Sequence, residues 1–365
     1  MNVTIPRSSL LAITEPCARG AGNGSPPITS CIRLSVAGDI ITGAATDLEV
    51  WVRQATTAPA PGTDGVVCVN AKKLHDVARA AADGPVTLAC DGSMLSIRAG
   101  RARTNLPTVH RDDFPDVPAV EPTATAALPG SQLAEALALV RFCASSDDTR
   151  RQFCAAQVRL VDGHIALDAT DGHRATQVRI PAEISGSLPE AALVPTSGID
   201  RILPLLTEDL VTLEFAPGFL HVLSDGGNII ARLIDGDAPD ISAVMPTGYT
   251  ISAKVGSADL VAAIRRVSVV ASERARGIRL KRGPTIKLSS ASPEHGEASD
   301  TVTIFGEPHP GTTTVGMNGS YISDIARALD SRVATLWFGT EEASPILVTC
   351  DDIPSLRHVI MPMRI

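Results

Sequence analysis

The sequence has little of what marks several common classes of protein. Aromatic residues make up only 3% of the chain, which disfavours a surface that binds single-stranded bases by stacking. No apolar run approaches the length needed to span a bilayer, and residues 1–10 lack a basic segment followed by a hydrophobic one. We therefore expect a cytoplasmic protein with no membrane partner.

Cysteine spacing and glycine loops exclude further classes. The chain has seven cysteines, an odd number, and no C-x-x-C pair, so neither a disulfide framework nor a zinc site is indicated. The expected role of these cysteines is that of small buried hydrophobic residues in a reducing compartment. No G-x-x-x-x-G-K-[ST] loop is present, which argues against ATP use. We expect no cofactor and no metal.

The charge balance argues against indiscriminate binding of nucleic acid. The net charge is −8, and a strongly basic protein would be expected for such binding. The six helices predicted below nevertheless hold 12 basic and 11 acidic residues, against 20 and 29 in the rest of the chain. This modest asymmetry is in the direction expected for helices that face phosphate. Solvated helix faces remain the alternative interpretation.

The most informative feature is a threefold repeat. Ile32-Arg33-Leu34, Val158-Arg159-Leu160 and Ile278-Arg279-Leu280 open similar stretches, at steps of 126 and 120 residues. Other landmarks keep nearly the same step, for example Ala45-Thr46-Asp47 and Ala169-Thr170-Asp171, 124 residues apart. A period this long is that of a whole domain with its own core. We expect domains at 1–121, 126–246 and 247–365.

Each copy has the same predicted order of elements. A helix with apolar residues at helical spacing precedes strands, and a second helix precedes a β-hairpin. Two helices and many antiparallel strands per copy indicate an α+β domain with helices on one face of a sheet. Pro204 should break or shorten the helix that contains it. The six predicted helices span residues 8–19, 71–83, 131–145, 196–209, 258–276 and 318–332.

Three connecting segments are predicted between and within the copies. Residues 118–129, rich in Pro, Ala and Thr, read as a linker between the first two copies. Pro246-Thr247-Gly248 marks the second boundary, and copy three has a longer polar loop over residues 289–299.

One cluster of polar residues could be read as a catalytic or metal site. Asp171, His173 and Arg174, with Asp168 close by, include side chains that serve as metal ligands or acid–base pairs. Asp171-Gly172 is also the sequence of a tight turn, and no Ser, Cys or Glu stands at a diagnostic spacing. The turn is the preferred interpretation, as it is for Asp162-Gly163-His164.

Two segments carry a resemblance to a known family. These are Ala169-Thr170-Asp171-Gly172-His173-Arg174 and the final Val359-Ile360-Met361-Pro362-Met363-Arg364-Ile365. Together they resemble the bacterial DNA polymerase III β subunit, the replicative sliding clamp. The likeness extends through Asp113-Phe114-Pro115 and Leu233-Ile234-Asp235-Gly236 and covers the whole chain.

The resemblance implies three processivity-fold (DNA clamp) domains, with helices lining an inner face and antiparallel sheets outside. Two subunits would join head to tail as a homodimeric ring of six domains around double-stranded DNA. Such a protein is non-catalytic and nucleoid-associated. It holds DNA by topology, so its contacts to phosphate should be weak and independent of sequence.

The resemblance also implies a peptide-binding groove between domains two and three. Its implied partners are the DNA polymerase III α subunit, the clamp loader, and other polymerases and repair proteins that carry short linear motifs. Flexible methionine side chains suit such varied partners. The implied groove residues are Phe153, Thr170, Gly172, His173, Arg174, Ala175, Pro239, Val244, Val359, Ile360, Met361, Pro362, Met363 and Arg364.

Two further sets of residues follow from the charge pattern and the resemblance. The residues expected to face DNA are Lys72, Lys73, Arg79, Arg141, Arg150 and Arg201. The implied dimer interface brings Leu106 of one subunit to Val269 and Val270 of the other. Thr104 occupies a position that is often Phe in the family, so closure could be weaker.

Four departures from the family pattern lie at the groove. Ala175 replaces a usual Leu, and Phe153 replaces a smaller aliphatic residue. Ala238 stands where an aromatic residue precedes Pro-Asp, and Ala243 stands at a basic position. These changes motivate an alternative, a clamp paralogue with selected partners or resistance to a groove-binding inhibitor. A hydrolase and a regulatory clamp-like protein that never encircles DNA are the other open alternatives.

Overall fold

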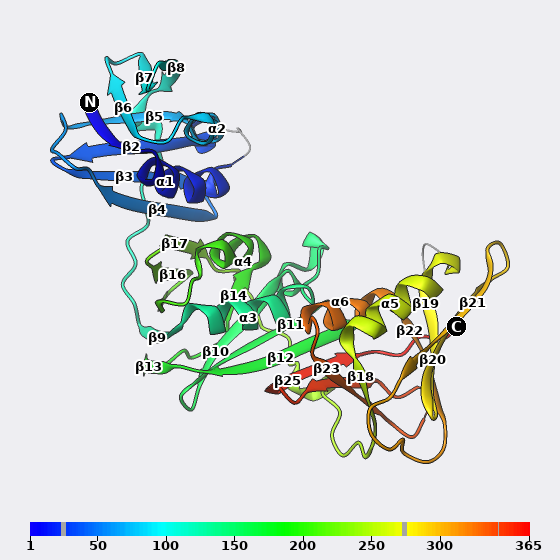
Figure 1. The fold of residues 1–365 in the computed structure, drawn as a ribbon. Coiled ribbons are helices and arrows are strands. Elements are labelled where there is room, and N and C mark those ends of the chain that lie inside the picture. Colours follow the sequence, from blue (N-terminus) through cyan, green and yellow to red (C-terminus); the bar gives the residue numbers. More distant parts are fainter. Residues whose placement is uncertain (23–26, 272–275, 342) are drawn as a thin grey trace. The chain divides into compact units, whose positions relative to one another are not determined.

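The protein is described here by a computed structural model that covers residues 1–22, 27–271, 276–341 and 343–365. It forms two compact units, shown in Figure 1. The first comprises Met1–Ala134 and Ala182–Ile234, and the second comprises Glu135–Pro181 and Asp235–Ile365. The predicted middle domain, residues 126–246, therefore contributes chain to both units.

One antiparallel sheet dominates the first unit. Its strand order is β1-β6-β7-β8-β5-β2-β3-β4-β17-β16-β15-β9-β13. The bounds of the first eight strands are β1 Asn2–Pro6, β2 Cys31–Ala37, β3 Ile40–Thr46, β4 Val50–Thr57, β5 Gly65–Asn70, β6 Pro85–Cys90, β7 Met94–Ala99 and β8 Ala102–Val109. The later strands of this sheet are β9 Ala124–Pro129, β13 Glu183–Gly186, β15 Leu210–Ala216, β16 Phe219–Ser224 and β17 Gly227–Arg232. Strand β14, Ala192–Pro195, lies in the same unit but not in this sheet.

Two copies of the repeat are joined through this sheet. Strand β4 of the first copy pairs with β17 of the second, with Val52 opposite Ile229 and Trp51 opposite Ile230. Because both partners donate and accept ladder hydrogen bonds, neither strand is left as an open edge at this junction.

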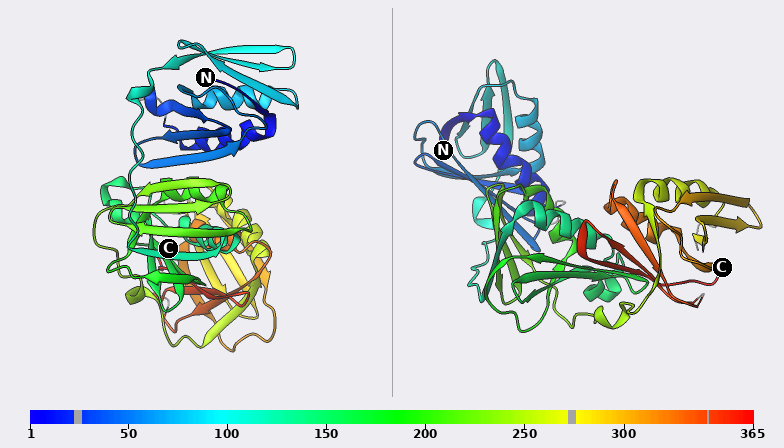
Figure 2. Two further views of the ribbon diagram at one scale, coloured as in Figure 1. Left: turned by 90° about the vertical axis from the view of Figure 1, so that its left-hand side faces the viewer. Right: turned by 60° about the horizontal axis from the view of Figure 1, so that its bottom comes forward.

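Helices α1 (Arg7–Gly20) and α2 (Ala71–Ala80) lie side by side in the first unit (Figures 1 and 2). In α1, Leu10, Ile13 and Cys17 recur at helical spacing and are fully buried against β3 and β4. Asn70 caps α2 by accepting a hydrogen bond from the Lys73 backbone N–H at 2.9 Å. Both helices begin and end close to the predicted bounds.

The second unit contains two antiparallel sheets. One runs in the order β10-β11-β12-β25-β24-β23-β18, and the other in the order β21-β20-β19-β22. The first sheet uses β10 Ala155–Val161, β11 His164–Thr170, β12 Arg174–Pro181, β18 Ile251–Gly256, β23 Val333–Phe338, β24 Ile346–Cys350 and β25 Ile353–Ile360. The second uses β19 Gly277–Arg282, β20 Thr285–Ser292, β21 Gly296–Thr303 and β22 Thr313–Asn318.

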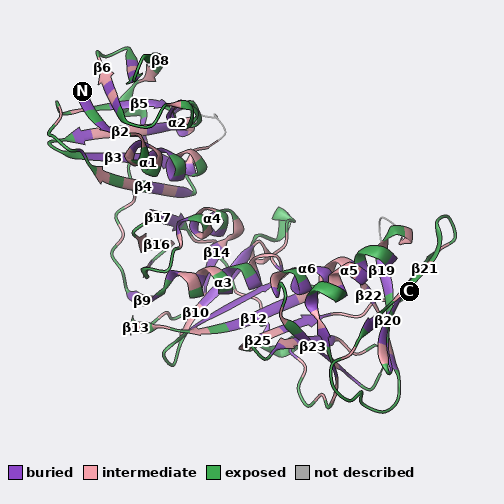
Figure 3. Ribbon diagram, viewed as in Figure 1, coloured by how far each residue is buried: buried purple, intermediate pink, exposed green. Residues whose placement is uncertain are grey.

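Helices α5 (Ser257–Val267) and α6 (Gly319–Ala328) pack against each other in the second unit. Helix α5 also packs against β20 and β21, and α6 packs against β22 and β25. Figure 3 shows the buried residues concentrated along the strands, and the exposed residues in the connecting loops and along helix surfaces. The unit therefore has the predicted α+β arrangement.

Short helical segments fill several connections. Helix α3 covers Gly130–Arg141 and α4 covers Thr196–Ile202. The 3-10 segments are η1 Pro27–Ser30, η2 Arg111–Asp113, η3 Asp148–Phe153, η4 Leu203–Leu205, η5 Ser242–Val244 and η6 Ser268–Val270. Pro204 lies in η4, directly after α4, so the prediction that it would shorten this helix is confirmed.

Several predicted bounds were wrong. The helix predicted for 258–276 ends at Val267 and passes into η6, while residues 272–275 lie outside the described residues. The predicted linker 118–129 is shorter, because Ala124–Pro129 pairs with β15 as β9. The predicted loop 289–299 is mostly a hairpin of β20 and β21. The polar composition of this segment concealed the strands, which are fixed by their pairing with each other.

Candidate functional site

The segment 170–174 forms a tight turn between β11 and β12. Gly172 has φ of 90°, a conformation that favours glycine. The Asp171 Oδ1 atom accepts hydrogen bonds from the backbone N–H groups of His173 and Arg174, at 2.9 and 3.1 Å. The predicted turn is confirmed, and the Asp171 carboxylate is used to hold it.

Arg174 fixes this turn to the rest of the second unit. Its Nε donates to Asp171 at 3.0 Å, Nη1 donates to Asp324 on α6 at 2.6 Å, and Nη2 donates to the Phe142 carbonyl at 2.6 Å. The side chain is only 10% exposed. Burial opposes the charged form, but the carboxylates of Asp324 and Asp171 outweigh it and the pKa of Arg174 lies above its ordinary value. Arg174 is therefore held in place by its own chain.

The chain's last residues extend the sheet beside this turn. Strands β12 and β25 are antiparallel, with Ala175 opposite Val359. The Met361 backbone N–H then donates to the His173 carbonyl at 2.9 Å, and the Met363 N–H donates to Gly316 of β22 at 2.8 Å. The two motifs that carry the resemblance thus form one continuous surface, which we call the candidate peptide surface (residues 170–175 and 359–364).

A small apolar cluster lies beneath the candidate peptide surface. Ala175 and Val359 are buried together with Ile241 and Met245, and Ile360 is buried as well. Val244, by contrast, is an exposed large hydrophobic residue. Gln157 of β10 donates from Nε2 to the Pro239 carbonyl at 3.0 Å, which places Pro239 against the same sheet. Some predicted groove residues, such as Ala175 and Val359, are therefore buried beneath the surface, whereas others, such as Val244, are accessible to a partner.

A buried polar cluster lies next to Val359. His358 is fully buried, and its Nδ1 lies 2.7 Å from the Thr176 hydroxyl and 3.7 Å from the Cys143 thiol. Burial, with the positive charge of Arg174 as a second cause, lowers the pKa of His358 from 6.5 to about 3. Burial also raises the pKa of the Cys143 thiol to about 12. Both groups are neutral at physiological pH and support the strand.

One aromatic residue at this surface, Tyr321, was not identified from the sequence. The ring of Tyr321 on α6 stacks on His173, with centroids 6.3 Å apart, and lies under the Arg174 guanidinium. Arg150, predicted to face DNA, covers the Phe153 ring at 4.8 Å. A methyl group on Gly172 would lie 3.7 Å from Arg150 Nη1. The scarcity of aromatic residues was the available signal, since Tyr321 is one of only two tyrosines.

Comparison with known proteins decides the family. Three profiles of the DNA polymerase III beta subunit match in chain order: its N-terminal domain over residues 1–118, its central domain over 127–240 and its C-terminal domain over 242–364. The chain belongs to this family, the bacterial beta sliding clamps.

Full-length relatives agree with that assignment. The beta sliding clamp of Vibrio cholerae is 26% identical over 372 residues, with both chains covered completely. A crystal structure of the DNA polymerase III subunit beta from Pseudomonas aeruginosa superposes with a TM-score of 0.93 at 26% identity, again over all of both chains. A second P. aeruginosa clamp structure, with the same TM-score and identity, contains bound griselimycin. The three-domain clamp fold expected from the resemblance is confirmed.

The residues predicted to face DNA differ in their surroundings. Lys72, Lys73 and Arg79 are exposed on α2. Arg201 on α4 is paired with Asp47 in the first unit. Arg141 is at the end of α3 and is partly exposed. Among the described residues, no carboxylate forms an ion pair with Lys72 or Lys73.

The predicted dimer-interface residues also differ in exposure. Val269 in η6 is 78% exposed, the highest value among the large hydrophobic residues of the described chain. Val270 is partly exposed. Leu106 in β8 is partly buried and packs against the hydrophobic core of the first unit. Val269 is therefore accessible to another surface, whereas Leu106 is largely engaged by its own core.

Two aspartates of the alternative catalytic or metal site have structural roles. Asp168 is fully buried and paired with Arg159, whereas Asp171 holds the turn. In the described residues, no group of three or more His, Cys, Asp or Glu side chains is placed to hold a metal ion.

No described helix is long and apolar enough to cross a membrane.

Proposed function

We propose that two copies of this chain close head to tail into a ring that encircles duplex DNA, and that the ring is a non-catalytic processivity factor of the cytoplasmic, nucleoid-associated replication machinery. The observation that carries the proposal is the match of all three beta-subunit domains over the full length of the chain. A ring of two such chains is standard for the family. The domain limits 1–121, 126–246 and 247–365 are part of the proposal.

We further propose that the candidate peptide surface tethers the polymerase III α subunit, the clamp loader and other partners through short linear motifs. Its architecture supports this role. Met361 and Met363 lie on a tail that is hydrogen-bonded at His173 and Gly316, so the main chain is fixed while flexible thioethers stay partly exposed. A preorganised backbone with adaptable side chains lowers the cost of binding several peptides.

A loading assay tests encirclement. The protein would be loaded on nicked circular DNA by its cognate clamp loader and the DNA-bound fraction isolated. Topological binding predicts retention on the circle and release when the DNA is linearised, at an ionic strength that removes ordinary phosphate contacts. Retention that is unchanged after linearisation would contradict the proposal.

A peptide titration tests the tethering surface separately. Met361→Ala should weaken a consensus clamp-binding peptide about 5- to 10-fold, the usual effect of removing one contributing apolar contact. Met94→Ala, which truncates an exposed methionine of β7, is the matched control and should leave affinity unchanged. Equal losses for the two variants would exclude the assigned surface.

The altered-groove alternative rests on Ala175. This side chain is 1% exposed and packs with Ile241, Met245 and Val359, so a leucine would fill the cluster below the surface and displace its neighbours. If the substitution has changed selectivity, Ala175→Leu should change the affinity for the consensus peptide. Equal affinities of the parent protein and the variant would sink this alternative.

A further inference from the structure

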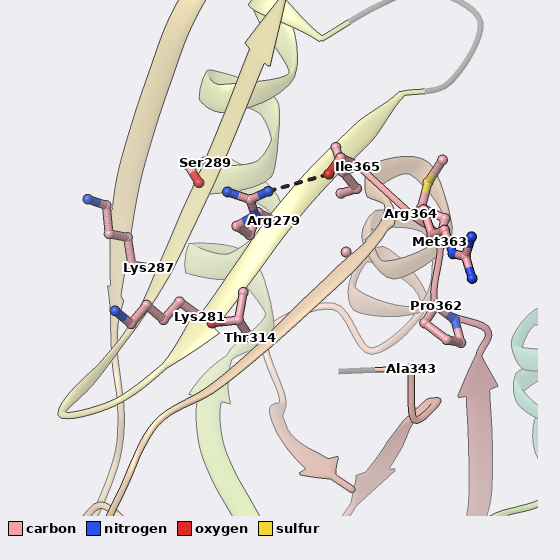
Figure 4. A pocket seen from close by; sticks show the side chains of 11 residues that line it. Arg279, Lys281, Lys287, Ser289, Thr314, Ala343, Pro362, Met363, Arg364 and Ile365 are labelled. Atoms are coloured by element: carbon pink, nitrogen blue, oxygen red, sulfur yellow. Dashed lines mark hydrogen bonds between the residues drawn. The ribbon is translucent and has the colours of Figure 1, made fainter. Parts of the chain in front are cut away.

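A basic channel lies along the β19-β20-β22 face of the second unit. Leu280, Ile286 and Leu288 point into the core and are fully buried, so the alternating residues of the same strands face the other way. The channel has a volume of about 870 Å³. Its lining includes Arg279, Lys281, Lys287, Thr314, Met363 and Arg364, and Figure 4 shows Lys281 and Lys287 on one side of Arg279 and the tail on the other.

The charges of the channel are unusual for this chain. The protein has a net charge of −8 and only five lysines, yet two lysines stand directly opposite each other, Lys281 on β19 and Lys287 on β20. Like charges at facing cross-strand positions repel each other and destabilise the pair. A selected function is a reason to keep such a pair despite its cost.

Lys281 and Lys287 have no carboxylate partner in the part of the chain that the structure describes. Two other exposed cations of the second unit are compensated, since Lys254 pairs with Asp351 at 2.6 Å and Arg266 pairs with Asp300. Arg279 donates to the main-chain oxygen of Ile365 at 3.4 Å. The channel therefore has positive charge available to a ligand.

The channel adjoins the candidate peptide surface. Pro362 and Met363 belong to that surface and also line the channel. The tail reaches the sheet because Gly316 has no side chain: a methyl group there would lie 2.5 Å from the Met363 carbonyl. A peptide seated on the candidate peptide surface would thus have a flanking segment close to Arg279, Lys281 and Lys287.

We propose that this basic channel binds acidic residues that flank the apolar motif of a partner peptide. The inference rests on the proposed tethering function and adds a charge preference to it. The mixture of cations with the apolar Pro362 and Met363 suits a peptide with acidic and apolar side chains. No aromatic ring is among the lining residues, so single-stranded nucleic acid would lack a stacking platform there.

Fluorescence anisotropy with paired peptides tests the proposal. A labelled clamp-binding peptide would carry four glutamates or four glutamines, added at its N-terminal or its C-terminal end. At low salt, one glutamate extension should bind roughly 3- to 10-fold tighter than its glutamine counterpart, as expected for a few exposed ion pairs. The gain should disappear at about 0.5 M salt and in Lys281→Gln/Lys287→Gln.

The matched control is Arg98→Gln/Arg101→Gln, which removes the same charge from exposed residues of the first unit and should keep the gain. No gain at either end, or a gain that survives in Lys281→Gln/Lys287→Gln, would overturn the proposal. So would an equal loss in both double variants, which would indicate a net-charge effect. Stronger competition by an oligothymidylate than by the glutamate peptide would assign the channel to nucleic acid instead. If even the glutamine peptides fail to bind, the tethering function itself is contradicted.

Discussion

At the scale of single residues, two side chains hold the candidate peptide surface from below. Arg174 joins the 170–174 turn to Asp324 on α6 and to the Phe142 carbonyl. His358 is buried next to Val359 and hydrogen-bonds Thr176. Arg174 is only 10% exposed and His358 is fully buried, so these residues affect peptide binding through the backbone they support.

Arg174→Ala should lower the free energy of unfolding by about 2–4 kcal/mol, because it leaves the partly buried carboxylates of Asp171 and Asp324 without their partner. Urea denaturation would measure the change. Arg327→Ala is the matched control, since Arg327 approaches the same Asp324 at 3.7 Å but is 62% exposed, and it should cost less than about 1 kcal/mol. Similar losses of unfolding free energy in the two variants would show that the burial of Arg174 does not determine its contribution to stability.

His358 should give the protein a specific dependence on pH. Its pKa is about 3 in the folded state against 6.5 ordinarily, so the unfolded chain takes up the proton first as pH falls. The stabilisation from neutral His358 is complete above pH 6.5 and is lost as pH falls from there toward 3. Between pH 7 and pH 5 the parent protein should lose about 2 kcal/mol more unfolding free energy than His358→Gln. Parallel pH profiles of the two proteins would contradict this assignment.

At the scale of elements, close packing between helix and sheet depends on small residues. In the first unit α1 lies on β3, where Gly43 faces it. A methyl group on Gly43 would lie 2.3 Å from Ile13 Cγ2 and 3.3 Å from Cys17 Sγ. The distance between α1 and β3 is therefore set by the absence of a side chain at Gly43.

Gly43→Ala should destabilise the protein by about 1–3 kcal/mol, since α1 would have to move off β3. Thermal unfolding followed by circular dichroism would detect it. At Gly283 the nearest atom to an added methyl group is 3.7 Å away, so Gly283→Ala should change stability by no more than about 0.5 kcal/mol. A Gly43→Ala protein as stable as its parent would show that this contact can relax freely.

Helices and strands were predicted correctly where the turn residues and the apolar pattern indicated the same structure. The β-hairpin predicted after the second helix of each copy is present in copies one and two, with turns at Asp91-Gly92 and Pro217-Gly218, because turn residues and alternation agree there. The helix over 258–276 was overpredicted, since valines at 267, 269 and 270 continue an apolar pattern although the α-helix ends at Val267. The strands within 289–299 were missed because neighbouring strands, rather than local hydrophobicity, fix them.

At the scale of the whole molecule, the exposed Val269 is the residue that bears on the proposed ring. Val269 is 78% exposed although it is a large apolar residue. The proposed ring would cover it against the surface that contains Leu106 of a second copy. The order of three related domains in one chain makes a head-to-tail contact between unlike ends geometrically natural.

Val269→Glu should raise the dissociation constant of the dimer at least about 10-fold, because a carboxylate would be buried without a partner. Analytical ultracentrifugation over a concentration series would measure it. Leu210→Glu places the same charge on another exposed apolar residue, 66% exposed in β15, and should leave the dimer unchanged. Dissociation constants that do not differ between the variants would remove Val269 from the interface.

The sequence by itself determined the repeat, the α+β class, the turn at Asp171-Gly172 and the family, because each depends on local pattern or ordered motifs. Only the tertiary structure decided which motif residues are accessible. It buried Arg174, Ala175 and Val359 under the candidate peptide surface, brought Tyr321 against His173, and set two lysines face to face on β19 and β20. These relations join strands and helices far apart in the chain, and long-range pairing and packing fix them rather than local propensity.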